Sequence, residues 1–286
     1  FAQKQERCTA QVATESIAMD EHPAQAVRKK KDSSIVVGCR MVKEGRAQGF
    51  FSPGSTGAVL AAATLVIGRV KGVARPALCS VIPSPKKPVV MADIGANADC
   101  KPAYLVQFAQ MAGTYAEKVL DVENPKIALL NIGEEETKGS KFSQESFALM
   151  KEAIPNFYGN AEGCDILMGE PDVYITDGFT GNVCIKTIEG TTKTLFGALK
   201  EIMMSSLSTK LAALALKGGL SELKETTSAD TYGGAPLLGV KGACLVGHGS
   251  SNAKAIENGI NTTAKTIRLN VSGIIEQMVS AGKSVE

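Results

Sequence analysis

The stretch that decides the fold is Tyr174-Ile175-Thr176-Asp177-Gly178-Phe179-Thr180-Gly181-Asn182. Its first residues are apolar and β-rich, which favours a short buried strand. The Thr-Asp-Gly that follows favours a tight loop, and the Thr-Gly-Asn after it opens a long helical pattern. A helix N-terminus at such a loop carries free backbone N–H groups, which bind anions. We therefore predict an anion site formed by Asp177, Gly178, Thr180 and Gly181.

The same order of strand, polar glycine loop and helix occurs at three other places. The loops are Gly54-Ser55-Thr56-Gly57, Asp93-Ile94-Gly95-Ala96-Asn97, and Asn131-Ile132-Gly133 with the residues up to Gly139. Strands that alternate with helices predict a mainly parallel sheet in a three-layer α/β/α fold. We therefore expect all four loops to form a single cleft at the carboxyl edge of this sheet, suited to a phosphate-bearing ligand.

Composition limits the possible functions. The 286 residues are 44% hydrophobic and 21% charged, which is typical of a globular protein and predicts one α/β/α domain over 1–286. A formal net charge of +2 and the absence of Trp give no indication of nucleic-acid binding. Seven cysteines without CxxC spacing favour reduced thiols, and two histidines, His22 and His248, do not support a His-based metal site. We expect neither a metal nor a cofactor.

Periodicity predicts the remaining elements. Strands are expected at Thr9–Ala13, Gln48–Phe51, Ala77–Ile82, Val89–Asp93, Lys126–Asn131, Phe157-Tyr158, Asp172–Thr176 and Ala243–Val246, and helices at Ile35–Arg46, Ser55–Val70 (closed by Gly72), Pro102–Val119, Ser143–Ala153 and Ser251–Val279 (interrupted at Gly259 and Gly273). No apolar run is long enough to span a bilayer, and no signal peptide is visible.

The region 183–228 differs from the rest of the chain. A long helix is expected at Val183–Leu216, then Lys217-Gly218-Gly219, then a short helix at Ser221–Thr226. Its apolar positions, interspersed with lysines, include Leu207, Leu211, Leu214, Leu216 and Leu220. We predict a helical hairpin that projects from the α/β body.

Several polar residues have both a functional and a structural interpretation. Lys138 either stabilises a phosphate or a developing oxyanion, or belongs to a charged surface loop. His248, between two glycines, either reaches a substrate or caps a helix. The loop 54–57 either holds phosphate or is only a tight helix start. Two basic clusters, Arg28-Lys29-Lys30-Lys31 and Arg69, Lys71 and Arg75, are either solvated faces or docking sites for an acidic protein or anionic lipid.

The order of eight motifs is more specific than any one of them. The chain is similar to the bacterial phosphate acyltransferases of the PlsX family from about Cys8 to the last helix. The motifs are Ala26–Ser34, Ser52–Ala58, Gly68–Ala77, Asp93–Asn97, Asn131–Gly133, Thr176–Asn182, Tyr232–Ala235 and Gly247–Ser250. The family begins with a strand and an Asp-Ala-Met-Gly-Gly-Asp loop, for which this chain, starting at Phe1, has no counterpart.

The resemblance implies a fold, a reaction and partners. The fold is the isocitrate/isopropylmalate-dehydrogenase-like one shared with phosphotransacetylases. The reaction converts long-chain acyl-ACP and inorganic phosphate to acyl phosphate and free acyl carrier protein, in phospholipid synthesis, and the product feeds a glycerol-3-phosphate acyltransferase. The family is a cytosolic homodimer attached peripherally to an anionic membrane, with the contacting tip at about Ser205–Lys224 here.

The expected chemistry gives roles to the predicted residues. Phosphate is already an anionic nucleophile and a thiol leaves readily, so catalysis reduces to holding phosphate in line and stabilising the oxyanion. The loops 54–57 and 178–181 are assigned to phosphate or phosphopantetheine, with Asp93, Asn97, Asn131 and Asp177 beside them. Lys138 and Asn182 are expected to orient phosphate and stabilise charge, and His248 to act as a polar contact or proton donor. A covalent intermediate on Cys184 is disfavoured, because no base lies beside it in the sequence.

Three alternatives remain. A phosphotransacetylase acting on acyl-CoA would share the fold and the chemistry. A metal- and NAD-dependent decarboxylating dehydrogenase of the same fold would need an Asp cluster, and the sequence shows no clear one. A non-catalytic, membrane-associated scaffold of lipid synthesis is the third, although four polar glycine loops have no purpose in a scaffold.

Overall fold

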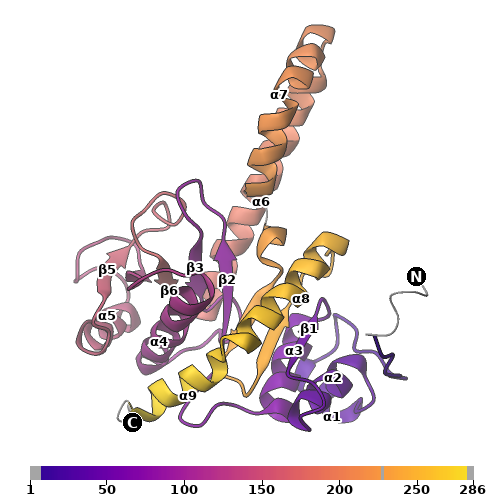
Figure 1. The fold of residues 1–286 in the computed structure, drawn as a ribbon. Helices are drawn as coiled ribbons and strands as arrows, with labels where there is room; N and C mark the ends of the chain where they lie inside the picture. The colour runs from indigo at the N-terminus through magenta and orange to yellow at the C-terminus, as the bar shows by residue number, and fades with distance from the viewer. Residues whose placement is uncertain (1–7, 227–228, 282–286) are drawn as a thin grey trace.

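The protein is an α/β/α body from which a helical hairpin projects (Figure 1). The computed structural model describes residues 8–226 and 229–281. An eight-stranded sheet has the order β1-β8-β7-β2-β3-β6-β4-β5. The strands are β1 (Gly49–Ser52), β2 (Ala77–Ile82), β3 (Val89–Ala92), β4 (Ile127–Leu130), β5 (Phe157–Ala161), β6 (Val173–Ile175), β7 (Ala235–Leu238) and β8 (Ala243–Val246). The helices are α1 (Pro23–Lys29), α2 (Ser34–Lys43), α3 (Thr56–Ala62) continued by η2 (Ala63–Ile67), α4 (Pro102–Val119), α5 (Lys141–Ala153), α6 (Gly178–Met204), α7 (Leu207–Thr226), η3 (Ala229–Tyr232), α8 (Ala253–Arg268) and α9 (Val271–Ala281).

The sheet contains two parallel groups that run in opposite directions. β3, β6, β4 and β5 are parallel to one another, as are β1 and β8. Between the groups, β7 and β2 make the three antiparallel pairings that reverse the direction. The mostly parallel α/β fold is confirmed, but the expectation of one carboxyl edge is wrong.

The strand register brings the two sets of carboxyl ends together. Ala92, at the end of β3, pairs with Cys79 in the middle of β2. Val246, at the end of β8, pairs with Ala235 of β7, which lies alongside β2. β8 runs in the same direction as β2, and β3 runs in the opposite direction. The loops that follow β8 and β3 therefore approach each other over the centre of the sheet. A cleft forms there rather than along one edge.

Side chains that alternate along β2 define the two faces of the sheet. On one face, Cys79 and Val81 join a core with α4, α5 and α9. On the other face, Leu78 packs in a cluster with α2 and α3, and Ile82 packs in a cluster with Ile185 of α6. Ser80 lies between Leu78 and Ile82 in this alternation, so a polar position separates the two clusters.

Local sequence sets where four of the helices begin. Ser55, Ser140, Asp177 and Asn252 each accept a hydrogen bond from the backbone N–H three residues on, at the starts of α3, α5, α6 and α8. Such caps satisfy donors that a helix start leaves unpaired. Short polar residues in the loops before these helices therefore serve partly as helix caps.

The hairpin turns at Ser205-Ser206, not at Lys217-Gly218-Gly219 as predicted. Ser206 and Thr209 cap each other: the Ser206 N–H donates to Thr209 Oγ1 at 3.0 Å, and the Thr209 N–H donates to Ser206 Oγ at 3.2 Å. This reciprocal cap begins a new helix. Gly218 and Gly219 lie inside α7, where the helix is exposed and an added Cβ would meet nothing within 4 Å. Residues 227 and 228, the end of the predicted region, lie outside the described residues.

Other boundaries also differ from the predictions. The expected final helix is two helices, because Asn270 has a φ of 49° and ends α8; Gly259 and Gly273 lie within helices. The helix after residue 55 ends at Ile67, since Gly68 has a φ of 95°. Thr9–Ala13 is not a strand; instead the chain bridges to Ser33 at Glu15. Sequence reasoning missed α1 and β7, both short elements that contain a proline.

Candidate active site

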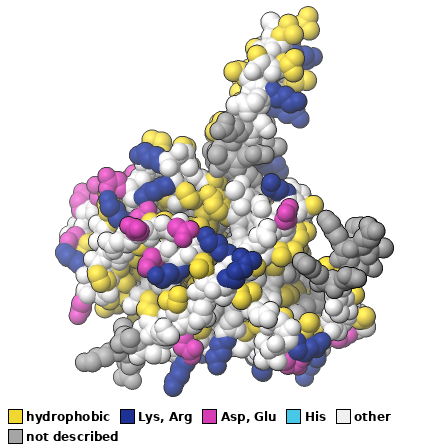
Figure 2. All heavy atoms as spheres, in the orientation of Figure 1, with side chains coloured by type: hydrophobic (Ala, Val, Ile, Leu, Met, Phe, Trp, Pro, Cys, Tyr) yellow, Lys and Arg dark blue, Asp and Glu magenta, His cyan; other side chains and the backbone are white. Residues whose placement is uncertain are grey.

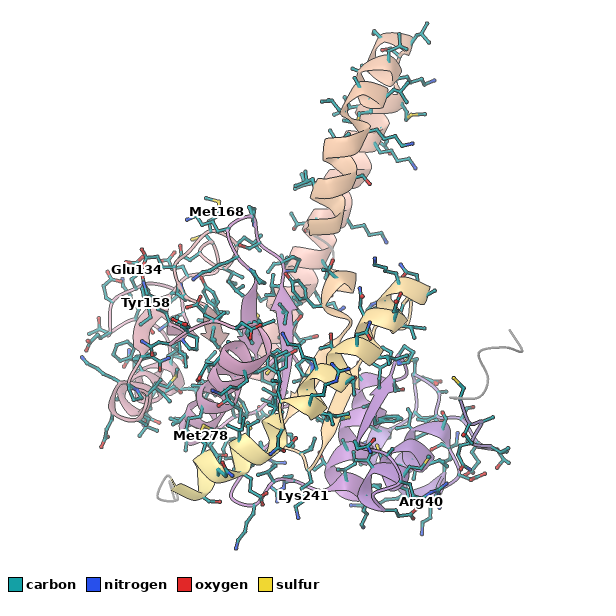
Figure 3. All side chains as sticks on the ribbon, in the orientation of Figure 1. Arg40, Glu134, Tyr158, Met168, Lys241 and Met278 are labelled. Atoms are coloured by element: carbon teal, nitrogen blue, oxygen red, sulfur yellow. The ribbon has the colours of Figure 1, made fainter. Side chains whose placement is uncertain are left out.

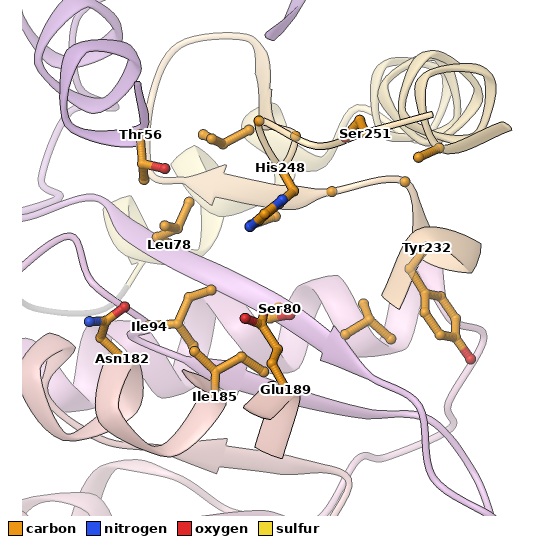
Figure 4. A pocket seen from close by; sticks show the side chains of 18 of the residues that line it. Thr56, Leu78, Ser80, Ile94, Asn182, Ile185, Glu189, Tyr232, His248 and Ser251 are labelled. Atoms are coloured by element: carbon orange, nitrogen blue, oxygen red, sulfur yellow. The ribbon is translucent and has the colours of Figure 1, made fainter. Parts of the chain in front are cut away.

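A cavity of about 410 Å³ occupies the gap between the two clusters of the second face. Its walls come from the loops after β1, β3 and β8, from the base of α6 and from η3 (Figure 4). His248 projects into it, with Thr56 and Asn182 toward one end and Tyr232 toward the other. Its polar side chains are those of Thr56, Ser80, Asn182, Lys186, Glu189, Tyr232, His248 and Ser251. The predicted loops 54–57 and 247–251 therefore meet in one site.

The loop 54–57 presents donors to this cavity. Ser55 is buried and caps α3 by accepting from the Ala58 N–H at 3.4 Å. Thr56 is exposed, and its hydroxyl and the backbone N–H groups of Thr56 and Gly57 have no partner among the described residues. Gly57 faces the Pro23 ring, where an added Cβ would lie at 2.7 Å. Thr56 is thus available to a ligand, whereas Ser55 and Gly57 hold the loop against its neighbours.

Asp93 organises its loop from within. Its side chain is fully buried, and its carboxylate accepts hydrogen bonds from the N–H groups of Leu78, Gly95, Ala96 and Asn97 and from the Asn97 amide, at 2.7–3.2 Å. Burial raises the pKa of this carboxyl above its ordinary value, and the hydrogen bonds oppose the rise. Asn97 also donates to the Pro76 carbonyl at 2.8 Å. In this conformation both predicted residues bind the chain itself, and Asp93 has no surface left for a ligand.

The stretch 174–182 is built around two close contacts. An added Cβ at Gly181 would lie 1.9 Å from the Asp93 carbonyl oxygen, and one at Gly178 would lie 2.6 Å from the Asn97 carbonyl oxygen. The Gly178 N–H donates to that Asn97 oxygen at 2.8 Å. These glycines let the start of α6 rest directly on the loop after β3. Their role here is backbone packing.

The first turn of α6 separates the main cavity from a smaller one. Thr180 and Asn182 are two residues apart, about 200° around a helix, so they point to opposite sides. Asn182 lines the main cavity, and Thr180 and Asp177 line a second cavity of about 280 Å³. Asn131, Gly139, Ser140 and Ser143 complete the polar side of the second cavity. The predicted residues therefore divide between two sites.

Lys138 lies on the loop between β4 and α5, whose residues Asn131 and Gly139 line the second cavity, but Lys138 itself lines neither cavity. It is exposed, and its ammonium is 3.9 Å from the Glu135 carboxylate. Amide side chains hold the loop: Asn131 donates to the Lys138 carbonyl at 3.2 Å and Asn160 donates to the Glu135 carbonyl at 2.9 Å. The structure does not bring Lys138 beside Asn182 and His248.

A different lysine occupies the main cavity. Lys186 follows Asn182 by one helical turn on α6, and Ile185 and Glu189 share this face. The Lys186 ammonium pairs with Glu189 at 2.7 Å. Sequence reasoning missed Lys186, although the Asn182-x-x-x-Lys186 spacing carries the signal. The signal was weak because lysines recur along this helix.

His248 has a defined tautomer in its neutral form. Its Nδ1 accepts from the Ser250 backbone N–H at 3.2 Å and lies 2.6 Å from the Ser250 hydroxyl. The proton of the neutral ring is therefore on Nε2, the nitrogen away from Ser250. The Asn182 amide makes no hydrogen bond with another described residue, so these two side chains offer N–H donors to a ligand.

Two observations concern other chemistries. Burial raises the pKa of the Cys184 thiol, which keeps it in the less nucleophilic protonated form. Within residues 8–226 and 229–281, no group of three or more His, Cys, Asp or Glu side chains is placed to hold a metal ion.

The predicted docking and membrane residues lie on the surface. Arg28, Lys29, Arg69, Lys71 and Arg75 are exposed. On the hairpin, Leu207, Leu211, Leu214 and Leu216 are 77%, 63%, 69% and 56% exposed, while Leu220 is half-buried. Figure 2 shows hydrophobic and basic side chains together at the projecting tip. None of the described helices is long and apolar enough to cross a membrane.

Comparison with known proteins identifies the family. The family model described as "Fatty acid synthesis protein" matches residues 2–273. The chain belongs to the fatty acid synthesis protein family. It is 50% identical to the phosphate acyltransferase of Desulfitobacterium hafniense (strain Y51) over 267 residues, which are 93% of the chain and 79% of that relative. It is 46% identical to the phosphate acyltransferase of Clostridioides difficile (strain 630) over 268 residues, again 93% of the chain and 79% of the relative.

Solved structures show that the family shares a wider fold. A phosphotransacetylase from Streptococcus pyogenes superposes with a TM-score of 0.55 at 17% identity, over 87% of this chain and 75% of that one. A branched-chain phosphotransacylase from Enterococcus faecalis V583 superposes with a TM-score of 0.52 at 16% identity, over 80% and 77%. At such identities the likeness concerns the fold alone, and it confirms the predicted fold class.

Proposed function

We propose that the chain transfers an acyl group from the thioester of an acyl carrier protein to inorganic phosphate, forming acyl phosphate and releasing the carrier thiol. Membership of the fatty acid synthesis family, with relatives that are phosphate acyltransferases, supports this reaction. The observation that carries it in the structure is the main cavity, where N–H and O–H donors from the loops after β1 and β8 and from α6 face apolar walls. Such a site suits an anion and a thioester, and it requires no bound cofactor in this scheme.

The donors in the cavity fit the bonds that form and break. A phosphate oxygen attacks the thioester carbonyl carbon, the C–O bond forms, the C–S bond breaks and sulfur leaves as a thiolate. The Thr56 hydroxyl, the N–H groups of Thr56 and Gly57 and the Lys186 ammonium hold the phosphate in line. The Asn182 amide donates to the oxyanion that develops on the carbonyl. His248 Nε2–H donates a hydrogen bond to the departing thiolate, which takes its proton from the attacking hydrogen phosphate once this has become the more acidic acyl phosphate.

The predicted role of Lys138 stays a proposal that competes with Lys186. Lys138 lines neither cavity, but Asn131 and Gly139 of the same loop line the second one, so Lys138 acts on the reaction only if phosphate or the pantetheine arm reaches the Thr180 side of α6. Lys186 lies beside Asn182 already. If Lys186 binds the reacting phosphate, the phosphate lies on the Asn182 side of α6. If Lys138 binds it, the phosphate lies on the Thr180 side.

The test is phosphate-dependent release of free thiol from palmitoyl-ACP by the full-length protein. Lys186→Ala and Lys138→Ala are compared with Lys193→Ala, which removes an exposed lysine two turns further along α6. We expect release to require phosphate, to fall about 100-fold in Lys186→Ala and to persist in Lys193→Ala. Release that is absent from the parent would reject the reaction. A loss confined to Lys138→Ala would move phosphate to the second cavity.

A phosphotransacetylase acting on acyl-CoA is the second candidate, because solved structures with that name share the fold. The same thiol assay distinguishes them: acetyl-CoA turning over faster than palmitoyl-ACP at equal concentration would favour the second candidate.

The hairpin is proposed to hold the enzyme at an anionic membrane as a peripheral, cytoplasmic protein. Its exposed leucines support this proposal, as do the lysines 193, 200, 210 and 217, which face a single acid, Glu201, between residues 190 and 220. We further propose a homodimer in which part of the hairpin is interface, and a glycerol-3-phosphate acyltransferase that consumes the acyl phosphate. An acyl phosphate is a mixed anhydride and is readily attacked, so an enzyme that uses it promptly is chemically expected.

A further inference from the structure

A second concave surface lies outside both cavities of the site. It measures about 350 Å³ and runs between α1, α2 and η2. We call it the basic groove. Its apolar wall includes Val27, Val36 and Leu65, and its charged residues are Arg28, Lys31 and Arg40. Leu65 is 48% exposed, so it offers an apolar contact between the three cations.

Arg28 and Lys31 have no hydrogen-bond or ion-pair partner for their side chains among the described residues, whereas Arg40 donates to the Lys31 carbonyl and lies near Asp32 and Glu44. None of the three cations is in an ion pair with a described residue. The nearest acid in sequence, Asp32, accepts from the Thr14 backbone N–H at 3.0 Å and from the Thr14 hydroxyl. Glu44 pairs instead with Arg46 at 3.6 Å. A partner that fits must therefore bring negative charge around an apolar stripe.

The other basic cluster lacks these features. The Arg69 guanidinium donates to the carbonyls of Val73 and Ala74 and so holds its own turn together. Val70 and Val73 of that turn are buried, as Val27 and Val36 of the groove are, but the turn has no exposed apolar residue comparable to Leu65. Lys71 and Arg75 thus form a charged surface without a hydrophobic contact, which favours solvation over docking.

The groove is one short helix away from the candidate phosphate loop. Pro23 begins α1 against Gly57, and α1 is 7 residues long, about 10 Å, ending at the groove. A carrier seated there would be within reach of the cavity through its flexible pantetheine arm. Arg40 is labelled in Figure 3 on the side of the body away from the hairpin. A membrane touching the hairpin tip would leave this side open to a protein in solution.

We propose that the basic groove is the docking site for one acidic, amphipathic helix of the acyl carrier protein, and that the Arg69 turn is not. The proposal rests on the proposed function and specifies where on this chain the carrier protein binds. The apolar wall receives the helix's hydrophobic stripe, and the three cations meet its carboxylates.

The experiment compares two acyl donors in the full-length protein. The KM for palmitoyl-ACP is divided by the KM for palmitoyl-CoA, which lacks the carrier, in Arg28→Glu/Arg40→Glu and in Lys71→Glu/Arg75→Glu. We expect the ratio to rise at least about tenfold in the first variant, because two docking charges are reversed. We expect the parent's ratio in the second. Leu65→Asp, a single exposed change, is expected to raise the ratio in the same direction and guards against misfolding of the double variant.

The outcomes separate the docking proposal from the reaction. Equal ratios in both double variants would overturn the groove as the docking site. Loss of sedimentation with anionic vesicles in Arg28→Glu/Arg40→Glu, at an unchanged ratio, would make the groove a lipid surface. A parent that releases no thiol from either donor would overturn the reaction, and the docking proposal with it.

Discussion

The two ends of α6 show what burial does to one continuous helix. At its start, Gly178, Gly181 and Ile185 are buried against the loop after β3 and the sheet; beyond Ile185, none of the described residues of α6 is buried. Many apolar residues of the projecting part, and of α7 beside it, face solvent, and the other described ones are half-buried at most. Hydrophobic residues alone therefore do not make a core, because a second layer must cover them.

The difference assigns separate tasks to the two ends. The base is held by close backbone contacts, so it positions Asn182 and Lys186 in the cavity with little freedom. The projecting part contributes no buried residue to the body, and an exposed apolar surface of this kind marks an interaction site. The comparison predicts that changes at the base affect folding and catalysis, and that changes at the tip affect only what the protein binds.

The largest effect is expected from Gly181→Ala. The new methyl group would lie 1.9 Å from the Asp93 carbonyl oxygen, so the helix start must move. We expect a loss of about 3 kcal/mol in the free energy of unfolding, measured by denaturant titration. Gly190→Ala is the matched control in the same helix, since its methyl group meets nothing within 4 Å. A comparable loss in the control would show that the projecting part is as tightly held as the base.

Asn182→Ala is expected to act on catalysis rather than on folding. Removing one donor to a developing oxyanion typically lowers kcat about 100-fold, or about 2.7 kcal/mol. Thiol release from palmitoyl-ACP measures kcat, and Thr191→Ala, an exposed position further along α6, is the control. If kcat is retained while stability falls, Asn182 belongs to the structural base and not to the reacting site.

Asp93→Asn tests the loop on which the base rests. The amide nitrogen would confront backbone N–H donors, so we expect a loss of about 2 kcal/mol. Because burial raises the folded pKa of Asp93, the native state binds its proton more tightly than the unfolded state does. The stability that the protein gains from this tighter proton binding is complete below the unfolded pKa of Asp93, and it is lost as pH rises through the folded pKa. The stability gap between parent and variant should therefore shrink as pH rises from about 4.

Denaturant titrations over that pH range check this behaviour. A gap that widens with pH would mean that the hydrogen bonds to the carboxylate outweigh its burial.

The smallest effect on stability is expected at the tip. Leu207, Leu211 and Leu214 lie at i, i+4 and i+7 on α7, so they form one exposed stripe. Their joint replacement by serine should change the free energy of unfolding by about 0.5 kcal/mol or less per site while abolishing sedimentation with anionic vesicles. Met168→Ser, which alters an exposed apolar residue of the body, is the control. Unchanged sedimentation combined with loss of the dimer would make the stripe a subunit interface.

Parts of the site follow from local sequence and parts do not. Asp177 and Ser55 cap their helices where the sequence places helix starts, because a cap depends on neighbours three residues away. The packing roles of Gly178 and Gly181 cannot be predicted from the local sequence, because the atoms that they contact belong to residues 93 and 97. The place of Lys186 in the site also cannot be predicted from the local sequence, because the opposite wall of its cavity is formed by the loop after β8.

The sequence by itself determined the alternation of strands and helices, the polar glycine loops at strand ends and the long amphipathic hairpin, because these depend on periodicity and on contacts within a few residues. Only the tertiary structure decided that the two parallel groups oppose each other, since the direction of β2 and β7 depends on pairing between distant segments. That reversal brings Thr56 and His248 to Asn182, whereas Asn131 and Gly139, from the loop that carries Lys138, line the second cavity on the Thr180 side of α6.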